Sequence, residues 1–199
     1  MATHDIIDTL AGIEPGSALD AIRAHRLQAR ENAQKSYLSL FEPIDASDFS
    51  LLERAAVAAF VTGLHGTSPV ATFYREKLAT TAGGATLLEA IDAEIVRGKT
   101  SGPYGSFPPG PLSVENTGGL IYRVSAERKS ALGARLVAAL EHAHLLVFRP
   151  RDAASADMKA LLAAGWSNTG IVTLSQLVAF LSFQVRVVSG LRTLAAANA

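Results

Sequence analysis

Apolar residues recur at helical spacing along most of the chain. The most apolar stretches are residues 51–64, LLERAAVAAFVTGL, and residues 167–190, where hydrophobic side chains follow at intervals of three and four with few charges between them. No segment alternates with a period of two, and the helical period also marks residues 68–82, 86–98, 126–148 and 155–165. The pattern predicts an all-α fold. Because residues 51–64 and 167–190 are too apolar for surface helices, we expect these two helices to pack against each other.

The N-terminal residues 1–46 are predicted to form a helical extension. Ser17 is a candidate N-cap for one continuous helix that reaches Phe41, and Pro43 helps to end this helix. The expected apolar side of this helix contains Leu19, Ile22, Leu27 and Ala33. Its expected solvated side contains Arg23, Arg26, Arg30 and Glu31. Ser47 or Asp48 then provides the N-cap of the next helix.

We expect residues 1–199 to form a single domain, because a chain of this length can bury one sizeable core. Two helical halves, residues 47–98 and 122–194, are joined by residues 99–121, which are rich in Gly, Pro and Ser. A connection of this length is typical of a lid, a binding loop or an interface arm, and equally of a flexible insertion. Tyr104 favours a loop that packs against the helices.

Composition and charge exclude several function classes. The chain has 18 Lys and Arg against 18 Asp and Glu and no long basic run, so neither nucleic acid nor a membrane surface is an expected partner. The absence of cysteine excludes disulfides, thiolate metal sites and thiol chemistry. Residues 170–191 approach the length of a membrane span, but Ser175, Gln176, Ser182, Gln184 and Arg186 interrupt them, which favours a buried helix. The N-terminus lacks a signal-peptide pattern, and we expect a cytoplasmic protein.

His142 and His144, in the sequence EHAH, are the only close histidine pair. On a helix, residues two positions apart point about 200° away from each other, so this pair cannot share a metal ion. We expect a solvated helix face here and predict neither a metal nor a cofactor. Phe148 and Trp166 are assigned to the core or to an oligomer interface.

The second half of the chain carries a recognisable series of residues. A short helix with an acidic start is followed by an LxxAGxS pattern, an Ile-Val pair and a long helix with phenylalanines, an arginine and a glycine. These positions are Ser155, Asp157, Leu161, Ala164, Gly165, Ser167, Ile171, Val172, Phe180, Phe183, Arg186 and Gly190. In order and spacing, residues 48–98 and 125–192 resemble the carboxymuconolactone decarboxylase and alkylhydroperoxidase D superfamily, especially its peroxidase-related branch. The resemblance implies an alkylhydroperoxidase D-like helical bundle that assembles as a homo-oligomer.

The resemblance also implies where an active site would lie. Active family members carry a glutamate on a helix, a cysteine twelve residues later, a second cysteine three further on and a histidine four beyond. Counted from Glu53, these positions hold His65, Ser68 and Thr72. Because peroxide reduction needs an attacking thiolate and a resolving thiol, the resemblance implies a divergent member without thiol peroxidase activity.

Two function classes are then open. The first is a carboxymuconolactone decarboxylase-like lyase or a related proton-transfer enzyme, which acts on a small organic acid with Glu53 and His65 as acid and base. The second is a non-catalytic protein that binds a small molecule, or a subunit that partners a cysteine-bearing paralogue.

The sequence HGTS, residues 65–68, has three interpretations. Thr67 or Ser68 caps a helix that begins at Pro69, while His65 ends the preceding helix. Alternatively, Ser68, His65 and Glu53 form the nucleophile, base and orienting group of a hydrolase. The third interpretation is a ligand pocket without covalent chemistry.

Arg186 needs a partner, because it lies in an otherwise apolar helix, and Glu53 is the expected one. The pair would be either a structural ion pair or a clamp for a substrate. We predict that Glu53 lies within reach of His65 or Arg186, in a pocket partly covered by the 99–121 loop. The expected binding residues are Thr72, Tyr104 and Arg186.

Overall fold

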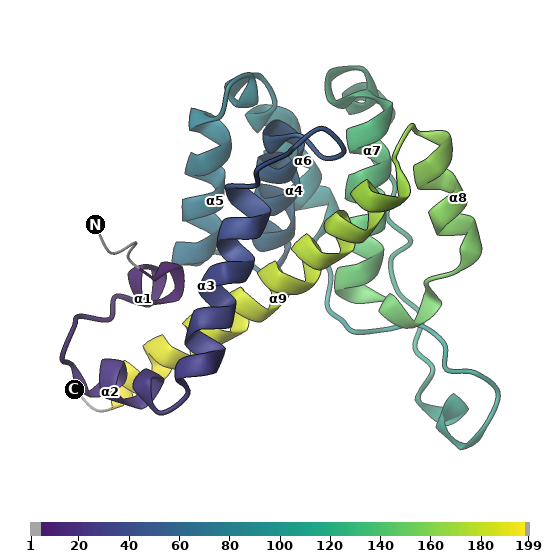
Figure 1. Ribbon diagram of the computed structural model, residues 1–199. Coiled ribbons are helices and arrows are strands. Elements are labelled where there is room, and N and C mark those ends of the chain that lie inside the picture. The colour runs from purple at the N-terminus through teal and green to yellow at the C-terminus, as the bar shows by residue number, and fades with distance from the viewer. Residues whose placement is uncertain (1–4, 198–199) are drawn as a thin grey trace.

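The protein folds into a bundle of α-helices (Figure 1). A computed structural model describes residues 5–197, and within this range there is no β-strand, only one isolated bridge between Gly105 and Thr117. The helices are α1 (Ile6–Ala11), α2 (Ala18–Ala24), α3 (Leu27–Phe41), α4 (Leu51–Leu64), α5 (Pro69–Thr80), α6 (Leu88–Gly98), α7 (Ala126–Phe148), α8 (Ser155–Ala163) and α9 (Asn168–Ala197), with short 3₁₀ turns η1 (Gly84–Thr86), η2 (Pro111–Glu115) and η3 (Pro150–Asp152). The all-α prediction is confirmed for this range. Residues 1–4 and 198–199 of the predicted domain lie outside the described residues.

Helix α4 forms the centre of the bundle. It contacts α5, α6, α7 and α9, and every side chain from Ala55 to Val61 is at most 2% exposed. Figure 1 shows α9 as a long helix that crosses the molecule, with α3 beside it. Small residues allow the close contacts of α4: a Cβ atom at Gly63 would lie 2.5 Å from Ile95 Cδ1 of α6. The predicted contact between α4 and α9 is confirmed.

The N-cap of helix α4 lies later than predicted. Ser50 is the N-cap, rather than Ser47 or Asp48, because Ser50 and Glu53 form a capping box. The Glu53 amide donates to Ser50 Oγ at 3.2 Å, and the Ser50 amide donates to Glu53 Oε2 at 3.0 Å. These two bonds satisfy amides that have no partner inside the helix. Ser47 instead donates its amide to Asp45 Oδ1 in the preceding turn.

The N-terminal extension contains three helices rather than one. Helix α1 has no counterpart among the predicted elements, and the expected continuous helix is broken at Arg26, which has φ −122° and ψ 50°. As a consequence, Ile22 and Leu27 do not reach the core and are 46% and 57% exposed. Ala33 is buried, as predicted.

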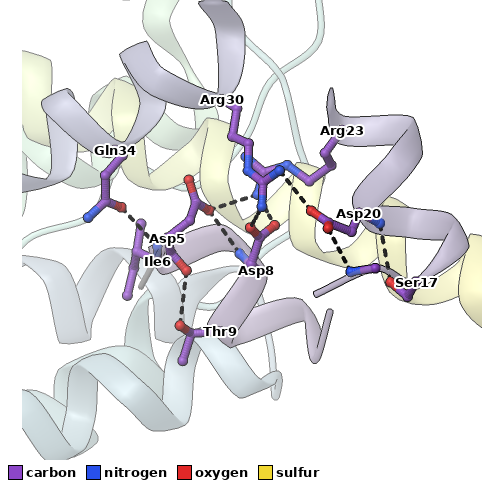
Figure 2. A network of polar contacts seen from close by, with 10 residues as sticks. Asp5, Ile6, Asp8, Thr9, Ser17, Asp20, Arg23, Arg30 and Gln34 are labelled. Atoms are coloured by element: carbon purple, nitrogen blue, oxygen red, sulfur yellow. Dashed lines mark hydrogen bonds and ion pairs between the residues drawn. The ribbon is translucent and has the colours of Figure 1, made fainter. Parts of the chain in front are cut away.

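A largely buried network of ion pairs joins α1, α2 and α3 (Figure 2). Asp8 of α1 accepts hydrogen bonds from Arg23 of α2 and from Arg30 of α3. Arg23 also pairs with Asp5 at 2.7 Å, and Arg30 pairs with Asp20 at 2.8 Å. The prediction that Arg23 is solvated is therefore wrong: its side chain is 8% exposed. Its burial depends on carboxylates from another helix, which the periodicity of one helix does not reveal.

The 99–121 loop is anchored at its base and projects at its tip. Tyr104 is 4% exposed, its amide donates to the Phe148 carbonyl at 2.8 Å, and its hydroxyl donates to the Leu120 carbonyl at 2.6 Å. The ring lies against the backbone of Gly119, where a Cβ atom would come within 2.4 Å of it. Figure 1 shows the segment around η2 extending away from the helices. The loop thus packs at its base, as Tyr104 predicts.

A fully buried carboxylate holds the chain just after the loop. Glu94 of α6 is 0% exposed and accepts hydrogen bonds from Tyr122 Oη at 2.7 Å and from Ser125 Oγ at 2.6 Å. Burial acts to raise the pKa of Glu94, but the hydrogen bonds from Ser125 and Tyr122 outweigh it and lower this pKa below its usual value. Because its oxygens already have protein donors, Glu94 has a structural role.

Helices α7 and α9 are each long and apolar enough to cross a membrane, by length and composition alone. In this fold, 50% of the apolar window of α7 and 39% of that of α9 are buried against other parts of the chain. Core helices of soluble proteins have the same two properties, so these properties do not by themselves indicate a membrane span.

Candidate functional site

The sequence-predicted site residues lie in separate places. Glu53 is in the first turn of α4 and His65 is the C-cap of the same helix, so at 1.5 Å per residue about 18 Å separates them along the axis. Ser68 and Thr72 belong to the start of α5, and Arg186 belongs to α9. His65 and Arg186 line one cavity, which Glu53 does not reach.

The partner of Glu53 is Arg135 of α7. Arg135 Nε donates to Glu53 Oε1 at 2.9 Å, and Ser50 Oγ donates to Glu53 Oε2 at 2.8 Å. Burial acts to raise the pKa of Glu53, but the hydrogen bonds from Arg135 and Ser50 lower it below its usual value, so the carboxylate is ionised near neutral pH. The expectation that Glu53 lies within reach of His65 or Arg186 is therefore wrong.

Arg135 connects three parts of the chain. Besides Glu53, its guanidinium donates to the carbonyls of Gly165 and Asp48, and it lies 4.5 Å from the centre of the Trp166 ring. These contacts join the start of α4 to α7 and to the turn before α9. The arrangement has the properties of a structural clamp, because its polar groups bind one another.

The HGTS sequence forms the junction between α4 and α5. Ser68 is the N-cap of α5, and its Oγ accepts a hydrogen bond from the Ala71 amide at 3.1 Å. Pro69 occupies the first turn, and His65 is the C-cap of α4. The interpretation of HGTS as a helix end is confirmed. Thr72 lies on the exposed side of α5.

His65 and Arg186 meet through Ser182 of α9. His65 Nε2 lies 3.4 Å from Ser182 Oγ, and Arg186 Nη1 donates to the Ser182 carbonyl at 2.7 Å. Burial lowers the pKa of His65, and the positive charge of Arg186 lowers it further, so the half-buried imidazole is neutral near neutral pH. A neutral imidazole can donate one hydrogen bond and accept another.

These residues border a cavity of about 570 Å³, which we call the His65 cavity. Its walls are mainly apolar and come from the loop base, from the C-terminal end of α7 and from α9: Gly102, Pro103, Leu146, Val147, Phe148, Pro150, Ser175, Val178, Ala179 and Ser182. The loop therefore forms one wall of this cavity, although the prediction placed it over a pocket that also holds Glu53. Tyr104 is not a lining residue; it anchors the loop through the backbone of Phe148.

His65 also lines a second hollow of about 460 Å³. Its other lining residues include Ser68 at the start of α5, and Ser189 and Arg192 of α9. His65 therefore borders two hollows, each with one arginine of α9 at its edge.

Ser182 was not expected in the site. Its position could have been found from spacing, because Ser175, Ser182 and Arg186 recur at intervals of seven and four residues and so share one face of α9. The partner of Glu53 gave no such signal, because Arg135 lies 82 residues away in the sequence.

The two α7 histidines are buried, which corrects the prediction of a solvated face. His144 is 0% exposed, its Nε2 lies 2.9 Å from the Gly98 carbonyl, and its ring stacks on Tyr122 at 4.7 Å. His142 is 5% exposed, and neither of its ring nitrogens has a hydrogen-bond partner. Burial lowers the pKa of both histidines.

Residues 5–197 contain no group of three or more His, Cys, Asp or Glu side chains arranged to hold a metal ion. Comparisons with protein-family models, with curated protein sequences and with solved structures found no match to this chain.

Proposed function

We propose that this protein binds a small organic acid in the His65 cavity, with Arg186 holding the carboxylate. The observation that carries this proposal is an exposed arginine, Arg186, which has no carboxylate partner and lines a mainly apolar cavity. Within residues 5–197, the only hydrogen bond of the Arg186 side chain goes to the Ser182 carbonyl. The guanidinium therefore has donors left for a ligand, and its planar shape suits a carboxylate.

The other groups of the cavity fit such a ligand. Neutral His65 and the Ser182 hydroxyl can each donate or accept a hydrogen bond, while Val178 and Phe148 offer apolar contacts. A volume of about 570 Å³ lies within the usual range of small-molecule sites. The ligand that suits these walls is a compact acid with an aromatic or branched aliphatic body.

Binding is favoured over proton-transfer catalysis. An acid and base pair made of Glu53 and His65 would need both groups on the same ligand, but the two lie at opposite ends of α4. Glu53 is also already bound to Arg135 and Ser50. His65 is left without a carboxylate that orients it.

We also propose that the chain is a divergent, cysteine-free member of the carboxymuconolactone decarboxylase and alkylhydroperoxidase D superfamily. The order of residues between Ser155 and Gly190 supports this assignment, and the contact between α4 and α9 is what such a bundle requires. In the absence of cysteine, a member of this superfamily has no thiol peroxidase cycle.

The binding proposal is tested by isothermal titration calorimetry with benzoate, and with benzamide as its uncharged counterpart. We expect benzoate to bind and benzamide to bind much more weakly. R186Q should weaken benzoate binding by about two- to fivefold, because Arg186 is exposed and solvent screens its charge. The matched control is R128Q, at the far end of α7, where Arg128 pairs with Glu89 at 2.8 Å. Equal affinities for benzoate and benzamide, or an unchanged affinity in R186Q, would refute the proposal.

A further inference from the structure

Another arginine also lacks a counter-ion but, unlike the exposed Arg186, it is buried. Arg54 of α4 is 4% exposed, and the described residues place no carboxylate in an ion pair with it. Its Nε donates to the Phe49 carbonyl at 2.7 Å and its Nη1 donates to the Leu40 carbonyl at 2.7 Å. The guanidinium also lies 5.1 Å from the centre of the Phe49 ring. Arg54 therefore carries a positive charge that only neutral groups offset.

Part of this environment is structural. The Leu40 carbonyl belongs to the last turn of α3, where the helix dipole favours a cation, so Arg54 helps to cap α3. Burial lowers the pKa of Arg54, although an arginine keeps its charge under these conditions. Two backbone carbonyls use two of the five guanidinium N–H groups. Within the described residues, Nη2 has no hydrogen-bond partner, and this atom is not fully enclosed by the protein.

The open side of Arg54 faces a groove between α3 and α9, which we call the Arg54 groove. Its volume is about 860 Å³, and Arg54 lines it together with Leu40, Pro43, Asp45, Ala33 and Phe180, among other residues of the two helices. Along α3 the lining runs from Ala29 to Leu40, a length of about 16 Å at 1.5 Å per residue. Phe183 belongs both to this groove and to an adjoining, mainly apolar hollow that continues to Leu191.

We propose that the Arg54 groove is a binding site for an amphipathic monocarboxylate, such as a medium-chain fatty acid. The carboxylate binds the Nη2 side of Arg54, and the apolar chain lies along Ala33, Phe180 and Phe183. This site is separate from the His65 cavity and does not depend on the function proposed for it.

Charge and shape support this class of ligand. A carboxylate supplies the anion that Arg54 lacks, and it accepts hydrogen bonds in the plane of the guanidinium. Asp45 also lines the groove, and its negative charge opposes an anionic ligand, less strongly for a monocarboxylate than for a ligand with two carboxylates. Lys35, the other cation of the lining, is exposed and lies 3.8 Å from Glu31, so it adds little. The groove also has polar lining residues, including Asn32, Ser39 and Thr173. One buried cation, with apolar side chains such as Ala33, Phe180 and Phe183 in the same groove, therefore fits a monoanion with an apolar tail.

The test is isothermal titration calorimetry with octanoate, below its micelle concentration, and with octanol as the uncharged counterpart. We expect octanoate to bind the wild-type protein, and R54Q to weaken this binding by about tenfold or more. R186Q, which alters only the His65 cavity, should leave octanoate affinity unchanged. If octanoate does not bind, or if R186Q weakens it and R54Q does not, the proposal is wrong.

Because Arg54 also caps α3, R54Q could unfold the protein, so a second variant blocks the groove without changing the charge. Ser36 is exposed on α3 and lines the groove, whereas Gln28 is exposed on α3 and does not. S36W should abolish octanoate binding and Q28W should preserve it. Full octanoate affinity in S36W would overturn the proposal. The proposal would also be wrong if a second copy of the chain covers the groove. In that case S36W would disrupt the dimer, and its sedimentation coefficient without ligand would differ from that of the wild type.

Discussion

Replacing Glu53 with glutamine separates a structural from a functional role for this residue. The change keeps the size of the side chain and one oxygen acceptor but removes the negative charge. The variant E53Q therefore loses the ion pair with Arg135, whose atoms lie 2.9 Å apart in the wild type, and its capping box with Ser50 is weaker. The remaining contacts of Arg135, with the Asp48 and Gly165 carbonyls and with Trp166, are unaffected.

The magnitude follows from these contacts. A hydrogen bond to a charged group contributes about 1.5–3 kcal/mol and a neutral one about 0.5–1.5 kcal/mol, so the loss of charge removes about 1 kcal/mol. A negative charge in the first turn of a helix adds about 0.3–1 kcal/mol through the dipole. Because the Glu53 side chain is 17% exposed and that of Arg135 is 35% exposed, solvent screens part of the pair. We expect E53Q to lower the free energy of unfolding by about 1–2 kcal/mol.

Urea unfolding, followed by tryptophan fluorescence and by circular dichroism, measures this change. Trp166 is the single tryptophan of the chain and lies against Arg135, so its fluorescence reports directly on the clamp. In the same variant, benzoate affinity should equal that of the wild type, because Glu53 does not line the His65 cavity. A loss of benzoate binding with unchanged stability would refute the structural assignment and return Glu53 to the binding site.

Two further predictions concern buried polar groups. D8N should lower the free energy of unfolding by about 3 kcal/mol, because it leaves the charges of Arg23 and Arg30 partly uncompensated. The control is E31Q, which removes an exposed pair with Lys35 and should change the free energy of unfolding by less than about 0.5 kcal/mol. Urea unfolding measures both variants, and equal effects would contradict the prediction. H142L should raise stability by about 1 kcal/mol, because it removes two unpaired buried nitrogens. Burial lowers the pKa of His142 in the folded state, so the unfolded chain takes up a proton first as the pH falls below the usual histidine pKa of about 6.5, and the folded protein loses stability. Between about pH 7 and 5, H142L should therefore lose less stability than the wild type. An equal pH dependence of stability in both proteins would exclude this account.

The parts of the fold that could be predicted depend on local chemistry. Ser68 followed by Pro69 satisfies and pre-forms the first turn of α5 within the segment itself. The apolar character of residues 55–61 likewise requires burial, wherever the partner helices lie. Residue type alone does not identify the N-cap of α4, because Ser47, Asp48 and Ser50 are all good N-caps. Only the reciprocal bond with Glu53, three residues beyond Ser50, distinguishes them.

The parts that could not be predicted depend on partners far along the chain. Arg23 has the spacing of a solvated residue in its own helix, and it is buried because Asp8 of another helix lies beside it. His144 likewise becomes a core residue because the Gly98 carbonyl and the Tyr122 ring lie next to it. For such residues, side-chain polarity predicts the need for a partner but not its identity.

The polar residues that interrupt α9 can now be explained by the surfaces that they meet. Ser175, Ser182 and Arg186 face the His65 cavity, and Gln176 faces the Arg54 groove. Gln184 is buried and accepts a hydrogen bond from the Tyr74 hydroxyl at 2.7 Å. Ala179 lines both hollows, so at this point a single small side chain of α9 lies between them. The solvent-facing side of a helix carries polar residues, and in α9 these residues line the two hollows in which we propose that ligands bind.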